Sequence, residues 1–128
     1  MKIILALLLF TTLISCSEEY GNKVKGGNLT VHFIDARDEA IAEKIAVFWK
    51  NNDLISSKKQ DIQLMRSKKG YRLNLIVENG ETLPPMNYAE SKALLDLQSM
   101  LRDSVFKEKR MEIFLCDNQF NPLYNINK

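Results

Sequence analysis

The sequence predicts an α+β domain in which two helices cover one face of an antiparallel β-sheet. Four segments alternate apolar and polar residues with the two-residue period of a strand, and two segments between them repeat apolar residues with the period of a helix. Their order is that of the ferredoxin-like βαββαβ sandwich, followed by a short C-terminal hairpin. Because crossovers between parallel strands are right-handed, both helices are expected on the same side of the sheet.

Four strands are predicted from runs that are rich in β-branched and aromatic residues. They comprise residues 29–34, 60–66, 71–77 and 111–116. A turn that contains Gly70 joins the second and third of these strands into a hairpin, since glycine readily adopts the positive φ of tight turns. A short fifth strand within residues 123–126 completes the C-terminal hairpin.

Two helices are predicted from apolar residues that recur three and four positions apart. The first begins after Asp35, which can cap its first turn, and its apolar stripe extends to Trp49. The second comprises residues 88–105. Residues 78–87 form the loop before it, because Pro84-Pro85 prevents an earlier helix start.

The charge of the chain argues against a nucleic-acid partner. The net charge is +2, and residues 16–128 contain 17 basic and 16 acidic side chains. This balance is also unlike a polybasic membrane patch. Residues 69–76 resemble the RNA-recognition-motif signature, but Leu73 and Ile76 occupy positions where that signature has aromatic residues, and Tyr71 has the parity of the helix-covered face.

The N-terminus has the pattern of an export signal. Lys2 supplies one positive charge, and residues 3–14 form an apolar segment. A bilayer-spanning helix needs about 20 apolar residues, and Glu18-Glu19 prevents an extension to that length. A cleaved signal is therefore expected instead of a transmembrane helix.

The end of this segment, Leu13-Ile14-Ser15-Cys16, resembles the bacterial lipoprotein signal, although Ile14 stands where Ala or Ser is usual. An ordinary secretory site fits less well, because it needs a small residue where Leu13 stands. The resemblance implies cleavage before Cys16 by signal peptidase II, diacylglycerol on its thiol and an acyl group on its amine. It divides the chain into a lipoprotein signal peptide (1–15), a lipidated cysteine with a glycine-rich flexible tether (16–28) and one domain (29–128).

The residues after Cys16 bear on localisation in the cell envelope. Ser17-Glu18-Glu19-Tyr20 resembles the acidic export tag of surface lipoproteins of Bacteroidota, and a simple solvated tether is the alternative. Ser17 replaces the aspartate that commonly retains lipoproteins in an inner membrane, so the resemblance implies the outer membrane. Residues 112–117 and Pro122-Leu123 are also similar to the ending of small uncharacterised exported domains of Bacteroidota, which have no known activity.

No catalytic site, metal site or cofactor is expected. With Cys16 lipidated, Cys116 has no disulfide partner, and its place at the end of an apolar strand predicts a packed, inert thiol. His32 is the single histidine, and no Cys, His or Asp cluster with metal-ligand spacing accompanies it. The sequence therefore predicts a protein that is not an enzyme.

Strand parity defines two faces of the predicted sheet. The face expected beneath the helices carries Leu29, Val31, Phe33, Ile62, Leu64, Leu73, Leu75, Ile113 and Leu115. On the opposite, open face, Ile34, Met65, Ile76 and Phe114 are expected to form an exposed apolar cluster. Such patches often bind partners, although apolar surface residues can be scattered, or the C-terminal segment can fold over them.

The preferred hypothesis is a membrane-anchored lipoprotein whose open face binds a protein partner or a second copy of the chain. The alternative is a small-ligand-binding lipoprotein with a cleft between the loop 78–87 and the open face.

Overall fold

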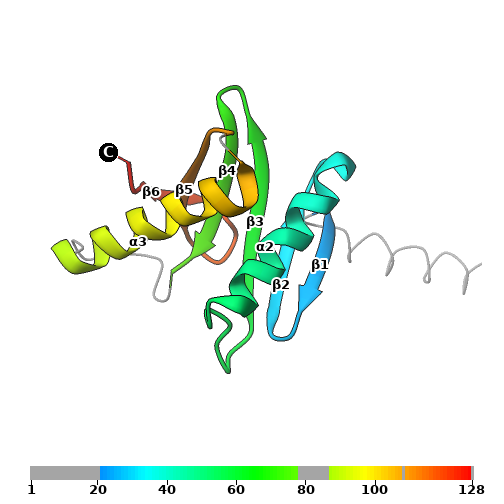
Figure 1. Ribbon diagram of the computed structural model, residues 1–128, viewed down its shortest axis with the longest axis horizontal. Helices are drawn as coiled ribbons and strands as arrows, with labels where there is room; N and C mark the ends of the chain where they lie inside the picture. The colour runs from blue at the N-terminus through cyan, green and yellow to red at the C-terminus, as the bar shows by residue number, and fades with distance from the viewer. Residues whose placement is uncertain (1–20, 78–86, 108, 128) are drawn as a thin grey trace, which may run out of the picture.

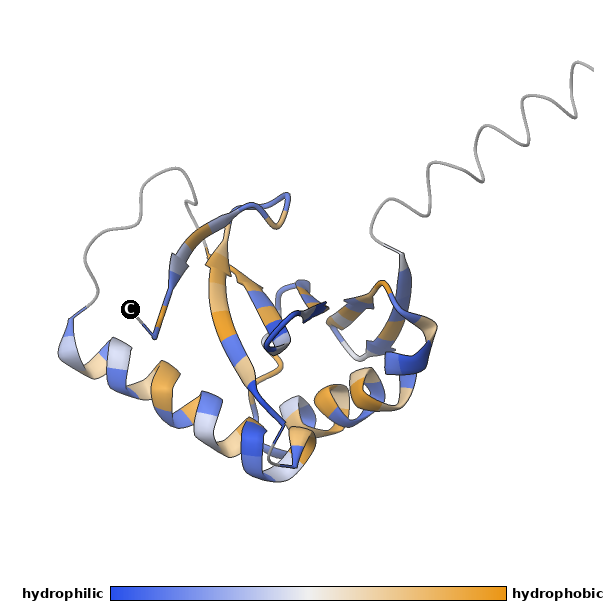
Figure 2. Cartoon of the chain, turned by 90° about the horizontal axis from the view of Figure 1, so that it is seen from above, coloured by the Kyte–Doolittle hydropathy of each residue, from blue (hydrophilic) through white to orange (hydrophobic). Residues whose placement is uncertain are grey.

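A computed structural model describes residues 21–77, 87–107 and 109–127, and these residues form one six-stranded sheet with both long helices on the same side (Figures 1 and 2). The strands are β1 (Asn22–Gly26), β2 (Leu29–Phe33), β3 (Gln60–Ser67), β4 (Gly70–Ile76), β5 (Met111–Cys116) and β6 (Pro122–Asn125). The helical elements are the 3₁₀ turn η2 (Ala36–Asp38), α2 (Glu39–Asn51), α3 (Tyr88–Leu101) and the π-helical turn η3 (Arg102–Phe106). Both predicted helices and all the predicted strands are present, so the α+β class is confirmed.

The strands are arranged in their sequence order, β1-β2-β3-β4-β5-β6. Helix α2 connects β2 to β3, α3 and η3 connect β4 to β5, and each of these strand pairs is parallel. The other three pairs are antiparallel. The prediction of an antiparallel, ferredoxin-like sheet is therefore wrong. In the ferredoxin-like fold another strand lies between the two strands that a helix joins, whereas here those two strands are direct neighbours. Period-two alternation fixes which side chains share a face, but it does not fix the direction of the neighbouring strand.

The predicted flexible tether, residues 16–28, ends in a strand. Within it, β1 pairs with β2 in an antiparallel register that sets Asn22 opposite Phe33 and Gly26 opposite Leu29. The described domain thus begins before residue 29. β1 was not predicted from the sequence because it is a polar edge strand. Its Val24 is half-buried against the core, and its two lysines are exposed. Edge lysines of this kind discourage pairing with another chain.

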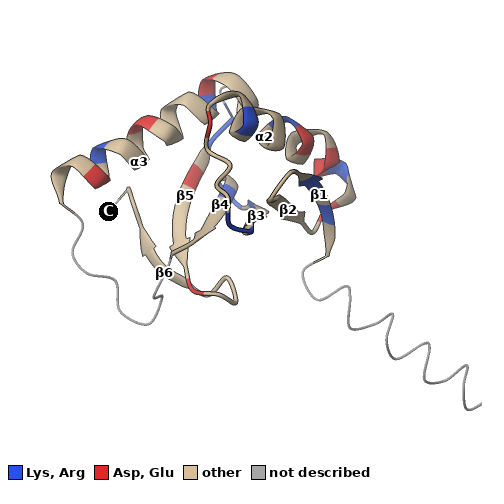
Figure 3. Cartoon of the chain, turned by 90° about the horizontal axis from the view of Figure 1, so that it is seen from below, with Lys and Arg blue, Asp and Glu red and all other residues tan. Residues whose placement is uncertain are grey.

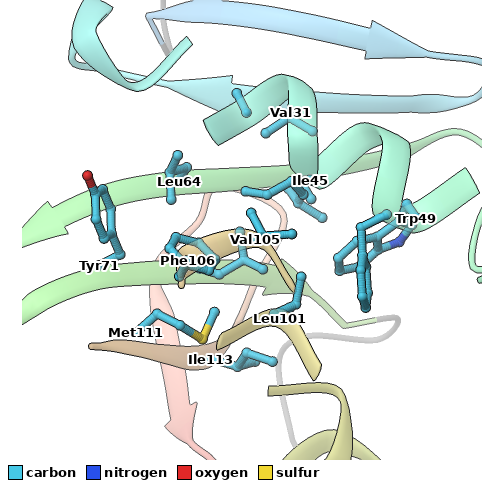
Figure 4. Close-up of a cluster of buried hydrophobic side chains, with 14 of the residues drawn as sticks. Val31, Ile45, Trp49, Leu64, Tyr71, Leu101, Val105, Phe106, Met111 and Ile113 are labelled. Carbon is cyan, nitrogen blue, oxygen red and sulfur yellow. The ribbon is translucent and has the colours of Figure 1, made fainter. Parts of the chain in front are cut away.

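The core lies between the helices and the sheet (Figure 4). Ile45, Phe48 and Trp49 of α2 are buried, as predicted from the helical stripe. α3 and η3 contribute Leu101 and the η3 residues Val105 and Phe106. The predicted helix-covered side chains of the sheet all belong to this core or pack against it. No helix in the described parts of the chain combines the length and apolar character needed to cross a membrane.

Candidate functional site

The predicted lipidation site lies outside the described residues. Cys16 and the box that precedes it belong to residues 1–20, and residues 78–86 of the predicted cleft loop are also undescribed. The remaining predicted site residues, Ile34, Met65, Ile76 and Phe114, can be placed.

Strand alternation places Met65, Ile76 and Phe114 on the open face, and Ile34 continues the alternation of β2 one residue beyond its end. The strand register separates the four residues. Met65 lies opposite Arg72 of β4, whereas Ile76 lies opposite Cys116 of β5. Phe114 lies opposite Asn74, in the row between those two. Ile34, immediately after β2, is 57% exposed, whereas Met65, Ile76 and Phe114 are half-buried. The four residues therefore surround a polar centre and do not form one continuous apolar cluster.

Asn74 is the middle of this polar centre and is completely buried. Its Nδ2 donates to Oε1 of Gln63 at 2.8 Å, and its Oδ1 accepts from Nε of Arg72 at 3.0 Å. The Arg72 guanidinium also lies 4.5 Å from the centre of the Phe114 ring, within the range of a cation–π contact. These contacts hold Arg72 and Phe114 in fixed orientations across three neighbouring strands.

The loop between β5 and β6 covers part of the open face. Phe120 is buried although it lies in a loop, and its ring meets the His32 ring edge-on at 5.8 Å. The His32 side chain is half-buried, and its Nε2 forms a hydrogen bond with Oδ1 of Asp61 at 2.9 Å. Backbone N–H groups of the loop donate to Asp117 and lower the pKa of its carboxyl group. The C-terminal segment thus folds over part of this face. This was one of the alternatives predicted from the sequence.

Cys116 is unsuited to nucleophilic chemistry. Its side chain is completely buried, and this burial raises the pKa of its thiol to about 11. The thiolate is the reactive form, so a raised pKa suppresses reactivity at neutral pH. Among the described residues, no three His, Cys, Asp or Glu side chains gather closely enough to hold a metal ion.

A hollow of about 510 Å³ lies at the end of the sheet where β4 ends. Ile76 and Val77 line it beside the start of the undescribed segment 78–86, and Asp61 and Asn118 add polar groups. Its volume lies within the range of small-molecule sites. The structure therefore has a concavity next to the place where the sequence analysis expected a cleft.

A second hollow, of about 860 Å³, lies at the opposite end of the sheet, and its lining is strongly basic. Figure 3 colours the Lys and Arg positions of the chain blue. We call this second hollow the basic hollow and define it by its six cationic side chains, Lys68, Lys69, Arg72, Arg102, Lys109 and Arg110. Two carboxylates, Asp103 and Glu112, also line it, and Glu108 between these basic residues in the sequence is not described. The small net charge of +2 concealed this concentration of positive charge.

The basic hollow forms because two parallel strands start side by side. Tyr71 at the start of β4 lies opposite Met111 at the start of β5, and the Tyr71 N–H donates to the Arg110 carbonyl at 2.8 Å. Gly70 has φ +136°, and a Cβ there would collide with that carbonyl oxygen. A glycine is therefore required for the turn between β3 and β4 to approach the segment before β5. The two basic segments meet through this contact.

A buried carboxylate supports the same region from the helix side. Asp38 is 1% exposed and accepts from Nε and Nη2 of Arg66 at 2.8–3.1 Å. It also accepts from the Tyr71 hydroxyl at 3.2 Å. Tyr71 is therefore buried against the helices, and burial raises its pKa. The aromatic ring of the RNA-recognition-like segment is not available for base stacking.

The comparison with protein families is decisive for classification. The model of the AF_1994_N family, described as a family N-terminal domain, matches residues 23–128. The chain belongs to the AF_1994_N family. No curated protein and no solved structure matches it.

The AF_1994_N match begins within β1 and includes the other five strands and both helices. The first strand is thus part of the family domain. The match also contains both basic segments and all four predicted residues of the open face. Each surface considered as a site therefore belongs to the AF_1994_N domain.

Proposed function

We propose that this AF_1994_N protein is a lipid-anchored, non-catalytic interaction module of the bacterial cell envelope, held at the outer membrane through Cys16. The lipoprotein-like box Leu13-Ile14-Ser15-Cys16 supports the anchor. One acyl chain gives only marginal membrane binding, and the chains expected on a lipidated cysteine give lasting attachment. The inert Cys116 thiol supports a non-catalytic role.

The observation that carries the proposal is that, among the residues that the structure describes, no helix covers one face of the six-stranded sheet (Figure 2). The open face presents Ile34 at 57% exposure, and Met65, Ile76 and Phe114 are half-buried around the polar centre. Protein interfaces combine apolar anchors with fixed polar groups in this way. We propose a protein as the partner, and a second copy of the chain is an outcome of the test.

The test is cross-linking in intact cells followed by mass spectrometry. Two single variants place a charge on the open face, Ile34→Glu and Ile76→Glu. Each is expected to lose the cross-linked partner and to keep the circular dichroism spectrum of the unmodified protein. Val47→Glu is the matched control, because Val47 is also 57% exposed but lies on α2 on the other side of the sheet. Loss of the partner in all three variants, or in none, would contradict the proposal. A species of twice the chain mass would identify a second copy.

The anchor is tested separately. Cys16→Ala is expected to move the protein from the detergent phase to the aqueous phase in a phase-separation experiment, and the added lipid mass at Cys16 is expected to disappear. Persistence in the detergent phase would remove the lipoprotein proposal.

A small-ligand-binding lipoprotein is the second candidate, and the hollow of about 510 Å³ beside Val77 favours it. Its lining joins the apolar Ile76 and Val77 to the polar groups of Asp61 and Asn118, as small-molecule sites do. Native mass spectrometry of the chain isolated from cells is expected to show a bound small molecule that Ile76→Trp displaces. An isolated chain with no added mass would count against this candidate.

A further inference from the structure

The chain enters the domain at the same end of the sheet as the basic hollow. Asn22 starts β1 and lies opposite Phe33, and Phe33 lies opposite Leu64 of β3. β3 continues only three residues further, to the turn that carries Lys68 and Lys69 (Figure 1). Gly21 packs against the same end, because a Cβ there would lie 2.8 Å from the Phe33 carbonyl oxygen.

The segment between the expected anchor and this end of the sheet is short. Cys16 precedes Asn22 by six residues, which span at most about 20 Å when fully extended. The basic hollow is displaced sideways from β1 by three strand spacings, or about 14 Å. A lipid on Cys16 would therefore keep the basic hollow close to the membrane surface.

The cations of the basic hollow are suited to bind phosphate groups. In the described residues, Lys68, Lys69 and Arg110 form no ion pair with a carboxylate. Arg72 is oriented by Asn74 and by the Phe114 ring. Guanidinium groups recognise phosphate through paired hydrogen bonds, and lysines attract it as flexible point charges.

We propose that the basic hollow rests on the phosphate-bearing headgroups of anionic lipids in the membrane that holds the anchor. This inference depends on the proposed lipid anchor and adds a second attachment that fixes the orientation of the domain. Each basic side chain near an anionic membrane surface adds attraction, which weakens as salt shortens the range of the electrostatic field.

The experiment measures which end of the domain approaches the lipid. The full lipidated chain is reconstituted into phosphatidylcholine vesicles with or without phosphatidylglycerol and with a nitroxide on a fraction of the headgroups. A fluorophore is attached through Ser67→Cys at the basic end or through Ser57→Cys at the opposite end, and both positions are exposed. Cys16 is blocked by lipid and Cys116 is buried. We expect quenching at position 67 to exceed that at position 57 severalfold, and only with phosphatidylglycerol.

A matched pair of charge reversals separates local binding from net charge. Lys68→Glu with Lys69→Glu is expected to abolish most of the excess quenching at position 67, because each lysine contributes roughly a fivefold change in partitioning. Lys58→Glu with Lys59→Glu makes the same change of charge before β3, at the other end of the sheet, and is expected to leave the quenching unchanged. Equal effects of the two double variants, or equal quenching at both labels, would overturn the proposal.

Two further arms identify the source of the phosphate and the cause of a failure. Inorganic phosphate that abolishes the quenching far more effectively than sodium chloride of equal ionic strength would assign the hollow to a free phosphate and overturn lipid binding. Retention of the chain on an oligonucleotide without any dependence on phosphatidylglycerol would overturn it too. The lipid mass on Cys16 is measured in the same samples. Its absence refutes the anchor, whereas its presence without preferential quenching refutes only the orientation.

Discussion

Replacing Asp38 with asparagine is expected to lower the free energy of unfolding by about 2 kcal/mol. The Asp38 carboxylate is buried where η2 ends and binds Arg66 through short contacts with Nε and Nη2. It also accepts from the Tyr71 hydroxyl, so it connects the start of α2 to both strands of the β3–β4 hairpin. Asparagine keeps the shape of the side chain but removes its charge and one of its two acceptor oxygens.

The magnitude follows from the different burial of the two partners. Removing one partner of a buried ion pair costs about 3–5 kcal/mol, because the other charge stays buried without compensation. Asp38 is 1% exposed, whereas the Arg66 side chain is 41% exposed and can be rehydrated by water. The loss is therefore smaller than for a fully buried pair and is close to that of a charge-assisted hydrogen bond, about 1.5–3 kcal/mol.

Thermal unfolding followed by circular dichroism measures this loss. For a domain of about 100 residues, 2 kcal/mol corresponds to a decrease in Tm of roughly 10 °C. Asp35→Asn is the control, since Asp35 binds Arg37 at 2.6 Å but the Arg37 side chain is 72% exposed. Hydrogen bonds from Arg37 hold the pKa of Asp35 well below its usual range, so that any stabilisation it gives is present above about pH 4 and is lost as the pH falls. A decrease as large for Asp35→Asn as for Asp38→Asn would refute the argument from burial.

Three further predictions concern residues that hold the fold. Because burial raises the pKa of the Cys116 thiol, iodoacetamide at pH 8 is expected to alkylate Cys116 about a hundredfold more slowly in the folded than in the unfolded chain. For the same reason, the free energy of unfolding is expected to fall as the pH rises from about 9 to about 11. Gly70→Ala is expected to cost about 2 kcal/mol or more in urea unfolding, because of its φ and its approach to Arg110, whereas Gly26→Ala has ordinary space and is expected to cost much less. Gln98→Leu removes a buried acceptor from a β5 backbone N–H and is expected to cost about 2 kcal/mol and to accelerate hydrogen exchange there.

The helices and most strands could be predicted because their apolar residues repeat with a clear period. Ile45 and Trp49 identified the buried side of α2, and alternation placed Leu64 and Leu73 beneath the helices. The same alternation could not show that β4 and β5 are parallel neighbours. Parallel pairing was overlooked because it depends on which strands meet in three dimensions, and both sheet arrangements satisfy the same pattern of side chains.

The open face was only partly predictable for a similar reason. Its residues were assigned to the correct side by parity, but the burial of Asn74 and Phe120 depends on cross-strand hydrogen bonds and on a loop that returns over the sheet. The ring of His32 likewise lies beside Asp61 of β3 and Phe120 of the loop between β5 and β6. Contacts of this kind join residues far apart in the sequence and leave no periodic signal.

The basic hollow was missed because net charge averages over the whole chain. The signal was present as two basic segments, Lys68-Lys69 and Lys109-Arg110, each of which lies just before the start of a strand. Strands that are parallel neighbours begin at the same end of a sheet. Knowledge of the β4–β5 pairing would therefore have brought these segments together before any side chain was placed.

The two ends of the sheet have different consequences for an anchored domain. If the basic hollow and the start of β1 face the lipid, the ends of β4 and β5 face away from it, because all strand directions follow from the register. Ile76 and the hollow of about 510 Å³ then lie at the membrane-distal end, where a soluble ligand or a protein partner can reach them. Ile34, which follows β2 at the same end as the start of β1, would in that orientation be closer to the lipid. A partner that depends on Ile76 but not on Ile34 would therefore bind from the membrane-distal side, and the proposed variants distinguish these two directions of approach.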